Sequence, residues 1–126
     1  MNVLQATRLL AVAAIVSLGA CGGGGVKSGG TDWSANAKDY RGQNGARYSY
    51  ACPANGTLVT VWGTDLYTDD SGVCSAAVHY GLITPAQGGT VVIEIRPGAS
   101  AYTGSTRNGV KSTDYGSWDG SFAFVK

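Results

Sequence analysis

This chain of 126 residues has little charge, a single histidine and three cysteines. Charged residues make up 13% of it, and its formal net charge is +1. One of its nine cationic residues, Arg8, lies in an N-terminal segment that we expect to be removed, so eight cations remain against eight acidic residues. Such a chain has no basic stripe to neutralise phosphates, which excludes nucleic acid as an expected partner. The lone His79 excludes a histidine-rich metal site.

The residue types that are plentiful indicate a small secreted domain. The chain has 20 glycines and seven tyrosines, together with many serines and threonines. Low charge with this mixture is typical of a β-rich domain outside the cytoplasm. Its length suits one such domain plus a short connecting segment.

The N-terminus has the features of a secretory signal. Arg8 supplies the positive charge, and residues 9–16 form an apolar run that is too short to span a bilayer. The run is followed by Leu18, Gly19, Ala20 and Cys21, which resembles the bacterial lipobox, where the cysteine becomes lipidated. We therefore expect residues 1–20 to be a lipoprotein signal peptide and Cys21 to carry the lipid, palmitate included. The alternative is an ordinary secretory signal in which Cys21 is incidental.

Lipidation at Cys21 would anchor the protein to a membrane, because two or three acyl chains hold a protein there essentially permanently. Gly22 stands where an aspartate usually retains such lipoproteins in the inner membrane. We therefore expect the bacterial cell envelope, and the outer rather than the inner membrane. Residues 21–46 are rich in glycine and polar residues, so we interpret them as a lipidated flexible tether. Trp33 and Tyr40 within it either dock on the domain or lie at the membrane surface.

Cys52 and Cys74 remain once Cys21 is assigned to the lipid. In an oxidising envelope compartment, two remaining cysteines are expected to pair. Closing a loop of this length stabilises a fold by about 3 kcal/mol in the chain-entropy description. Two free thiols are the alternative.

Residues 47–126 form the expected domain, and hydrophobic alternation predicts several strands within it. Residues 90–96 alternate between an apolar and a mixed face, residues 58–62 are a β-prone run, and residues 121–126 place Phe122 and Phe124 on one face. Turns are predicted at the pairs Asn108 with Gly109 and Asp119 with Gly120.

One helix is predicted between these strands. Asp70 or Ser71 would cap its start, and Gly81 would end it in the left-handed conformation. Apolar residues recur at a helical spacing over more than a third of its circumference, so a sheet is expected to wrap around it. The predicted apolar stripe comprises Val73, Cys74, Ala76, Ala77, Val78 and Tyr80, whereas Gly72, Ser75 and His79 would face elsewhere.

Several separated motifs follow one another along the domain: the tyrosine-to-glycine segment 67–81, the pair Gly88 and Gly89, the segment containing Tyr102, residues 108–112, and the closing pair Ser121 and Phe122. In this order they resemble the LCCL module of extracellular proteins. The resemblance implies an α+β fold in which a central helix is wrapped by two small antiparallel β-sheets. Family members usually have four cysteines in two disulfides, and this chain retains a single pair.

His79 is the one residue on which a catalytic hypothesis can rest. Ser75 lies one helical turn before it, so a small hydrolase can be drawn, but no nucleophile elbow or other local signature supports one. The LCCL signature has a histidine at this place, which favours a structural hydrogen bond between the helix and a loop. We therefore expect no enzyme and no cofactor.

Asp65, Asp69 and Asp70 form the one acidic cluster and are candidate calcium ligands. Their spacing does not follow the calcium loop D-x-D-x-D-G, and helix capping and turn formation already explain Asp69 and Asp70. We therefore expect no metal site.

Aromatic residues in loops and at strand ends offer the best candidate binding surface. Tyrosine and tryptophan rings beside polar groups stack on sugar faces and anchor shallow binding sites. Trp62 and Tyr67 are expected in the core. The candidate ligand-binding residues are Tyr102, Arg107, Asn108, Tyr115 and Trp118.

Together these observations predict a membrane-anchored envelope lipoprotein that presents a non-catalytic LCCL-like binding or adhesion module. By the resemblance, its partner would be a polysaccharide, lipopolysaccharide or another envelope component, a step that rests on fold analogy. One alternative is a structural protein–protein interaction module of a larger envelope complex. A small hydrolase that uses His79 is the other.

Overall fold

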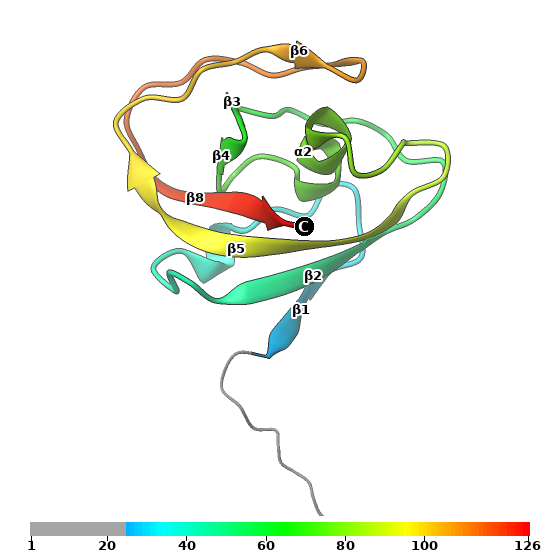
Figure 1. The fold of residues 1–126 in the computed structure, drawn as a ribbon, viewed down its shortest axis with the longest axis horizontal. Helices are drawn as coiled ribbons and strands as arrows, with labels where there is room; N and C mark the ends of the chain where they lie inside the picture. The colour runs from blue at the N-terminus through cyan, green and yellow to red at the C-terminus, as the bar shows by residue number, and fades with distance from the viewer. Residues whose placement is uncertain (1–24) are drawn as a thin grey trace, which may run out of the picture.

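The computed structural model describes residues 25–126, which fold into one helix and two sheets (Figure 1). The predicted lipoprotein signal peptide, residues 1–20, and the predicted lipidation site Cys21 lie outside these residues. No helix in the described part of the chain is long and apolar enough to cross a membrane. The elements are β1 (Val26–Gly30), the 3₁₀ helix η2 (Lys38–Tyr40), β2 (Arg47–Cys52), β3 (Gly63–Thr64), β4 (Leu66–Thr68), α2 (Val73–Tyr80), β5 (Gly89–Ala99), β6 (Thr106–Arg107), β7 (Val110–Lys111) and β8 (Trp118–Val125).

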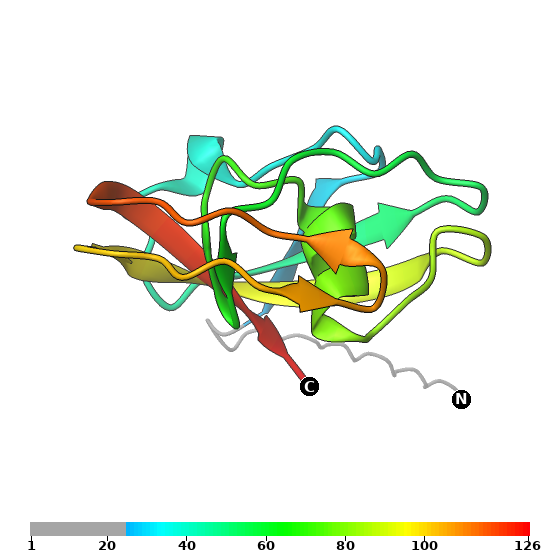
Figure 2. The same ribbon diagram turned by 90° about the horizontal axis from the view of Figure 1, so that it is seen from above.

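The larger sheet has six strands in the order β1-β2-β5-β8-β4-β3, and the smaller one is the pair β6-β7. β1 pairs with β2 in parallel, and the other neighbours are antiparallel. The predicted α+β class is therefore confirmed, with the difference that the large sheet is mixed. Helix α2 lies between the large sheet and the β6-β7 hairpin (Figures 1 and 2).

β5 and β8 form the centre of the large sheet. Val91, Ile93 and Ile95 of β5 are buried, as their alternation predicts, and Phe122 and Phe124 of β8 are both buried beside them. β8 begins before Asp119, so the turn predicted at Asp119 and Gly120 is wrong.

Gly98 lies inside β5 and Gly120 lies inside β8, at points where neighbouring segments pass very close to the strand. A Cβ at Gly98 would lie 2.1 Å from the carbonyl oxygen of Trp118, and one at Gly120 would lie 2.0 Å from Oδ2 of Asp69. At these two positions glycine serves close packing between neighbouring segments, and neither has a positive φ.

Helix α2 is covered on more sides than its apolar stripe predicts. Gly81 ends it in the left-handed region with φ 99°, as expected. Ser75 and His79, which were expected to face elsewhere, are both fully buried. The expected side-chain cap is absent: the N-cap residue is Gly72, and the Ser71 hydroxyl instead accepts a hydrogen bond from the Trp62 amide.

Residues 58–62 do not form the predicted strand. The Val59 amide donates to the Ser75 hydroxyl, and the Thr60 carbonyl accepts from the Gly72 amide. The Val61 carbonyl accepts from the Thr113 amide. The backbone of this segment is thus satisfied mainly by the start of the helix and by Thr113, and it has no continuous partner strand in the described part of the chain.

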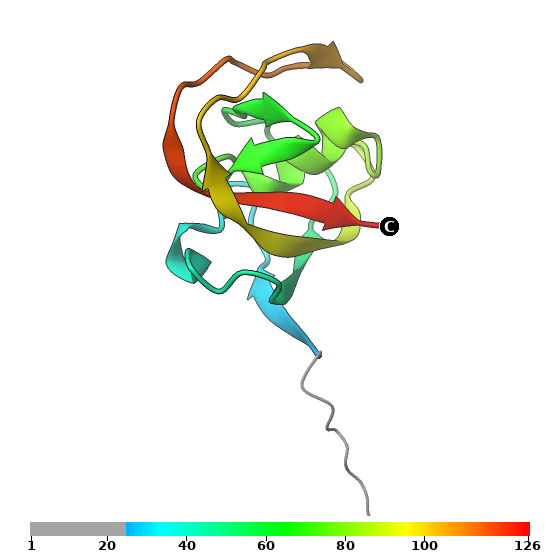
Figure 3. The ribbon, with the colours of Figure 1, turned by 60° about the vertical axis from the view of Figure 1, so that its left-hand side comes forward.

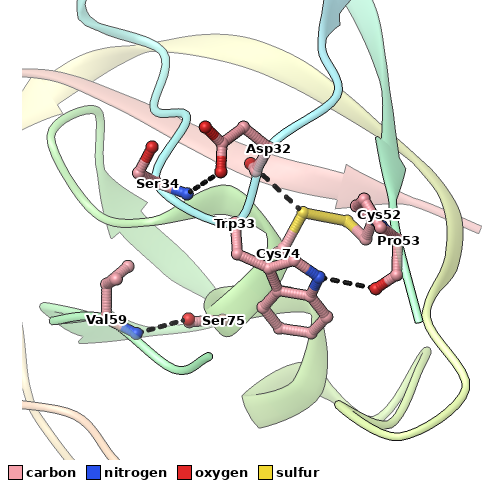
Figure 4. The surroundings of a disulfide bond; sticks show 8 residues. All are labelled: Asp32, Trp33, Ser34, Cys52, Pro53, Val59, Cys74 and Ser75. Atoms are coloured by element: carbon pink, nitrogen blue, oxygen red, sulfur yellow. Dashed lines mark hydrogen bonds between the residues drawn. A yellow bond between two sulfur atoms is a disulfide. The ribbon is translucent and has the colours of Figure 1, made fainter. Parts of the chain in front are cut away.

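A disulfide joins Cys52, at the end of β2, to Cys74, in the first turn of α2, and confirms the predicted pair (Figure 4). The Trp33 indole lies beside it and donates to the Pro53 carbonyl at 2.7 Å (Figure 4). A Cβ at Gly56 would lie 1.9 Å from this ring, so the chain passes directly against it.

Residues 26–46 differ from the flexible tether that their composition predicts. β1 pairs with β2, Trp33 and Ala37 are buried, and the Tyr50 hydroxyl donates to the Asn36 carbonyl. Tyr40 stacks on Tyr48 with ring centroids 3.8 Å apart. Aromatic anchors and strand pairing attach a polar segment that has few apolar residues of its own, so the packed region starts at residue 26 and not at residue 47.

Candidate functional site

The β6-β7 hairpin and its approaches form a separate face of the molecule, opposite the large sheet (Figure 3). Residues 102–107 and 110–115 run side by side, with Tyr102 bridged to Tyr115. Asn108 and Gly109 make the turn at its tip, both with positive φ, which confirms the turn predicted there. Thr113 is bridged to Trp62, so the hairpin is also joined to the segment that precedes β3.

His79 attaches this hairpin to helix α2. Its Nε2 lies 3.0 Å from the carbonyl oxygen of Ser105, and its Nδ1 lies 2.9 Å from the Tyr67 hydroxyl. Because a carbonyl only accepts, Nε2 carries the proton and Nδ1 accepts from Tyr67. The Asn108 side chain donates to the backbone carbonyl of His79 at 3.0 Å. Burial raises the pKa of Tyr67 to about 12, so its hydroxyl remains a donor.

Ser75 and His79, the pair on which the hydrolase hypothesis depends, do not contact each other as a nucleophile and its base. His79 is fully buried, and the Ser75 hydroxyl accepts from the Val59 amide instead of facing the imidazole. The imidazole hydrogen-bonds on both nitrogens to groups of the fold. In this arrangement His79 links a helix to a hairpin and offers no open side to a substrate.

The three acidic candidates for calcium are not brought together as a cluster. Asp65 pairs with Arg107 at 2.8 Å, and both carboxylate oxygens of Asp69 receive hydrogen bonds from Arg41 at 2.7 and 2.8 Å. Within residues 25–126 no group of three or more histidine, cysteine or acidic residues is arranged to hold a metal ion.

Asp69 is a buried carboxylate that contacts Arg41 and Trp118. Besides Arg41, the Trp118 indole N–H donates to its Oδ1 at 2.8 Å. Burial by itself would raise the pKa of Asp69, but the hydrogen bonds from Arg41 and Trp118 outweigh it and hold the pKa below its usual value. The same pairing raises the pKa of Arg41. The guanidinium also lies 5.2 Å from the centroid of the Trp118 ring, within the range of cation–π attraction.

The five ligand-binding candidates separate into two groups. Tyr102 is buried, and its hydroxyl accepts from the Ala99 amide and donates to the Trp118 carbonyl, so its prediction as a surface residue is wrong. Arg107 is engaged with Asp65, and Asn108 with the helix carbonyl. Tyr115 and Trp118 come together at the surface, with ring centroids 5.5 Å apart.

Trp62 lies next to Tyr115, which in turn contacts Trp118, although the sequence predicts Trp62 in the core. It is half-buried rather than buried, and its ring centroid lies 6.2 Å from that of Tyr115. Tyr115 is 41% exposed and stands between the two tryptophans. We call Trp62, Tyr115 and Trp118 the aromatic face. No local motif indicates that Trp62 belongs to it, because Trp62 comes from a segment far away in the sequence that meets the other two rings only in the folded chain.

Comparison with known proteins identifies a common module. The family model for the LCCL domain matches residues 30–122. Clotting factor C of Tachypleus tridentatus is 38% identical over 95 residues, which is 74% of this chain and 9% of that protein. Human vitrin is 44% identical over 66 residues, 52% of this chain and 10% of vitrin. Mouse cochlin is 36% identical over 77 residues, 60% of this chain and 14% of cochlin. The matching region is thus only about a tenth of the length of these relatives.

Proposed function

The chain belongs to the LCCL domain family, and from this premise we propose that it is a membrane-anchored envelope lipoprotein whose LCCL domain binds a glycan, without catalysis, through the aromatic face. The observation that carries the proposal is the grouping of Trp62, Tyr115 and Trp118 at one surface. The polysaccharide, lipopolysaccharide or envelope component that it binds is part of the proposal.

The physical chemistry of the aromatic face suits a sugar. Exposed rings present apolar faces against which the C–H side of a pyranose can stack, and tryptophan and tyrosine dominate such shallow interfaces. Arg41 next to Trp118 has its charge matched by Asp69, so long-range attraction contributes little. Stacking and directional hydrogen bonds must then supply the affinity.

The route of the chain is compatible with an anchor at Cys21. β1 enters at the side of the molecule opposite the β6-β7 hairpin (Figure 1). β1 begins five positions after Cys21, and five residue steps of chain span at most about 18 Å. A lipid on Cys21 would therefore hold the domain close to the membrane, with the hairpin directed away from it.

Glycan binding is tested with the full chain in mild detergent and a panel of peptidoglycan, lipopolysaccharide and purified polysaccharides, followed by tryptophan fluorescence. We expect saturable binding to one class. Tyr115→Ala should weaken it at least tenfold, since truncating a central aromatic anchor costs about 2 kcal/mol or more. Leu82→Ala, at an exposed apolar residue outside the aromatic face, is the matched control and should leave the affinity within about twofold.

Two results would contradict the glycan proposal. One is saturable binding that Tyr115→Ala leaves unchanged, and the other is silence of the whole panel, which would favour the alternative of a protein–protein interaction module. The anchor is tested separately by labelling growing bacterial cells with radioactive palmitate. Label is expected on the native chain and not on Cys21→Ser, and an unlabelled native chain would refute lipidation.

A further inference from the structure

An open hollow of about 400 Å³ lies along the β6-β7 hairpin, beside the aromatic face. Gly104, Ser105 and Thr106 line it from one arm, and residues 111–114 line it from the other. The arms approach closely at Gly104, where a Cβ would lie 2.5 Å from the carbonyl oxygen of Ser112. Any other residue at Gly104 would push the arms apart, so the hollow depends on glycine there.

The hollow contains both a hydrogen-bond acceptor and a cationic donor. Asp114 accepts from the Gly104 amide with Oδ1 at 2.7 Å, and its Oδ2 takes part in no hydrogen bond within residues 25–126. Lys111 forms none of the four ion pairs of that region. The side chains of Thr106 and Thr113 add hydroxyl groups at exposed positions. One carboxylate and one ammonium cancel in charge, which favours an uncharged ligand.

The hollow and the aromatic face form one continuous surface. Thr113 and Asp114 line the hollow and directly precede Tyr115 in the chain. Thr113 is also bridged to Trp62, the second ring of the aromatic face. Lys111 lines the same hollow as Asp114, and both side chains belong to exposed residues. A sugar ring that stacks on Tyr115 therefore lies at the border of the hollow.

We propose that the hollow is the polar subsite of the glycan site, where Asp114 and Lys111 bind two neighbouring hydroxyl groups of an uncharged hexopyranose whose apolar face lies on Tyr115. The Oδ2 atom of Asp114 accepts a hydrogen bond from one sugar hydroxyl, and the ammonium of Lys111 donates to the oxygen of the next. This inference rests on the proposed glycan binding and assigns the direction in which the sugar hydroxyls point.

The test is an NMR titration of the ¹⁵N-labelled full chain in mild detergent with three probes: methyl β-glucopyranoside, methyl β-galactopyranoside and methyl α-mannopyranoside. At least one is expected to shift the amide resonances of residues 104–106 and 111–115 saturably. Asp114→Asn and Lys111→Met should each weaken this binding about tenfold or more, because a hydrogen bond to a charged group is lost. Lys27→Met, at an exposed lysine on β1, is the matched control and should leave the affinity unchanged.

Asp114→Asn is chosen because the amide oxygen of asparagine still accepts from Gly104, so the hairpin keeps its shape while the second acceptor becomes a donor. A melting temperature equal to that of the native chain checks this. Absence of saturable shifts with all three probes, or shifts that both hollow variants leave unchanged, would overturn the subsite. If a polysaccharide binds and Tyr115→Ala abolishes its binding while Asp114→Asn does not, the subsite is wrong and the proposed function stands. If Tyr115→Ala also leaves polysaccharide binding intact, the proposed function itself fails.

Discussion

Two aromatic clusters of this domain have similar ring chemistry and opposite environments. Tyr67, Tyr80, Phe122 and Phe124 contact one another with ring centroids 5.3 to 5.8 Å apart, and all but the half-buried Tyr80 are buried. Helix α2 covers this inner cluster, and its buried His79 bonds to Tyr67. The rings of the aromatic face are spaced at 5.5 and 6.2 Å, but the central one is 41% exposed.

The two clusters differ in burial because helix α2 packs against the rings of one cluster and not against those of the other. Tyr67 of β4 packs against His79 of the helix, and Phe124 of β8 packs against Tyr80 of the helix, so these rings are enclosed by a second layer. Trp118 begins β8, and Trp62 and Tyr115 belong to segments outside the large sheet. Trp62 and Trp118 are half-buried there, and Tyr115 is exposed. Equivalent side chains thus stabilise the core in one place and remain available for a ligand in the other.

The largest expected effect is the loss of a ring from the inner cluster. Phe122→Ala should lower the free energy of unfolding by about 3–5 kcal/mol, since it removes a fully buried phenyl group and leaves a cavity. Urea unfolding followed by circular dichroism measures this change. A loss below about 1 kcal/mol would show that the inner cluster does not carry the core.

The disulfide should come next in size, because it fixes the helix that covers the inner cluster. Cys74→Ser is expected to reduce stability by about 3 kcal/mol under non-reducing conditions. Thermal melts of the native chain with and without reductant provide the comparison. Identical melting curves in the two conditions would refute a stabilising role for the bond.

Asp69 should make its contacts with Arg41 and Trp118 sensitive to acid. Its pKa is lowered in the folded state, so its contribution is fully present above its unfolded value of about 3.9 and is lost as the pH falls through the folded value. Asp69→Asn should cost about 1–3 kcal/mol at pH 6, a range kept modest because Arg41 is partly exposed.

The measurement for Asp69 is urea unfolding from pH 6 to pH 3. The stability difference between the native chain and Asp69→Asn should shrink below about pH 4, because the carboxyl group of the unfolded chain takes up a proton at a higher pH than that of the folded chain. Asp119→Asn, at an exposed neighbouring aspartate, is the control and should follow the native curve. A gap of constant size across the whole pH range would refute the ionised Asp69–Arg41 pair as its source.

The smallest stability effect is expected at the aromatic face. Tyr115→Ala should change the free energy of unfolding by less than about 1 kcal/mol, because the residue is 41% exposed and its ring makes only T-shaped contacts with the two tryptophans. Thermal melts of Tyr115→Ala and Phe122→Ala under the same conditions compare the stability that each aromatic cluster contributes. A loss of 2 kcal/mol or more would assign Tyr115 to the core and remove the basis for a free binding face.

Local sequence signals predict those parts of the fold that depend on neighbouring residues. The alternation of residues 90–96, the left-handed stop at Gly81 and the turn at Asn108 and Gly109 are all present as predicted. Residues 58–62 and 26–46 were misread because their backbone groups and aromatic anchors find partners far away in the sequence. Composition and propensity contain no information about those partners.

The candidate site shows the same division at the level of single residues. The sequence identifies Tyr115 and Trp118 as ring-bearing loop or strand-end residues, and both lie on the aromatic face. It misplaces Tyr102, whose hydroxyl is used inside the fold, and gives no hint of Arg41, which reaches Trp118 and Asp69 from the N-terminal segment. Long side chains bridge segments, and only the folded chain shows which segments are adjacent.

The sequence by itself determined the family, the α+β class, the helix with its glycine stop and the pairing of Cys52 with Cys74, because each depends on short motifs, periodicity or a count of cysteines. Only the tertiary structure decided which rings are buried and which are exposed. That outcome depends on where helix α2 and the β6-β7 hairpin lie over the sheet, and layer placement is set by contacts between residues distant in the chain.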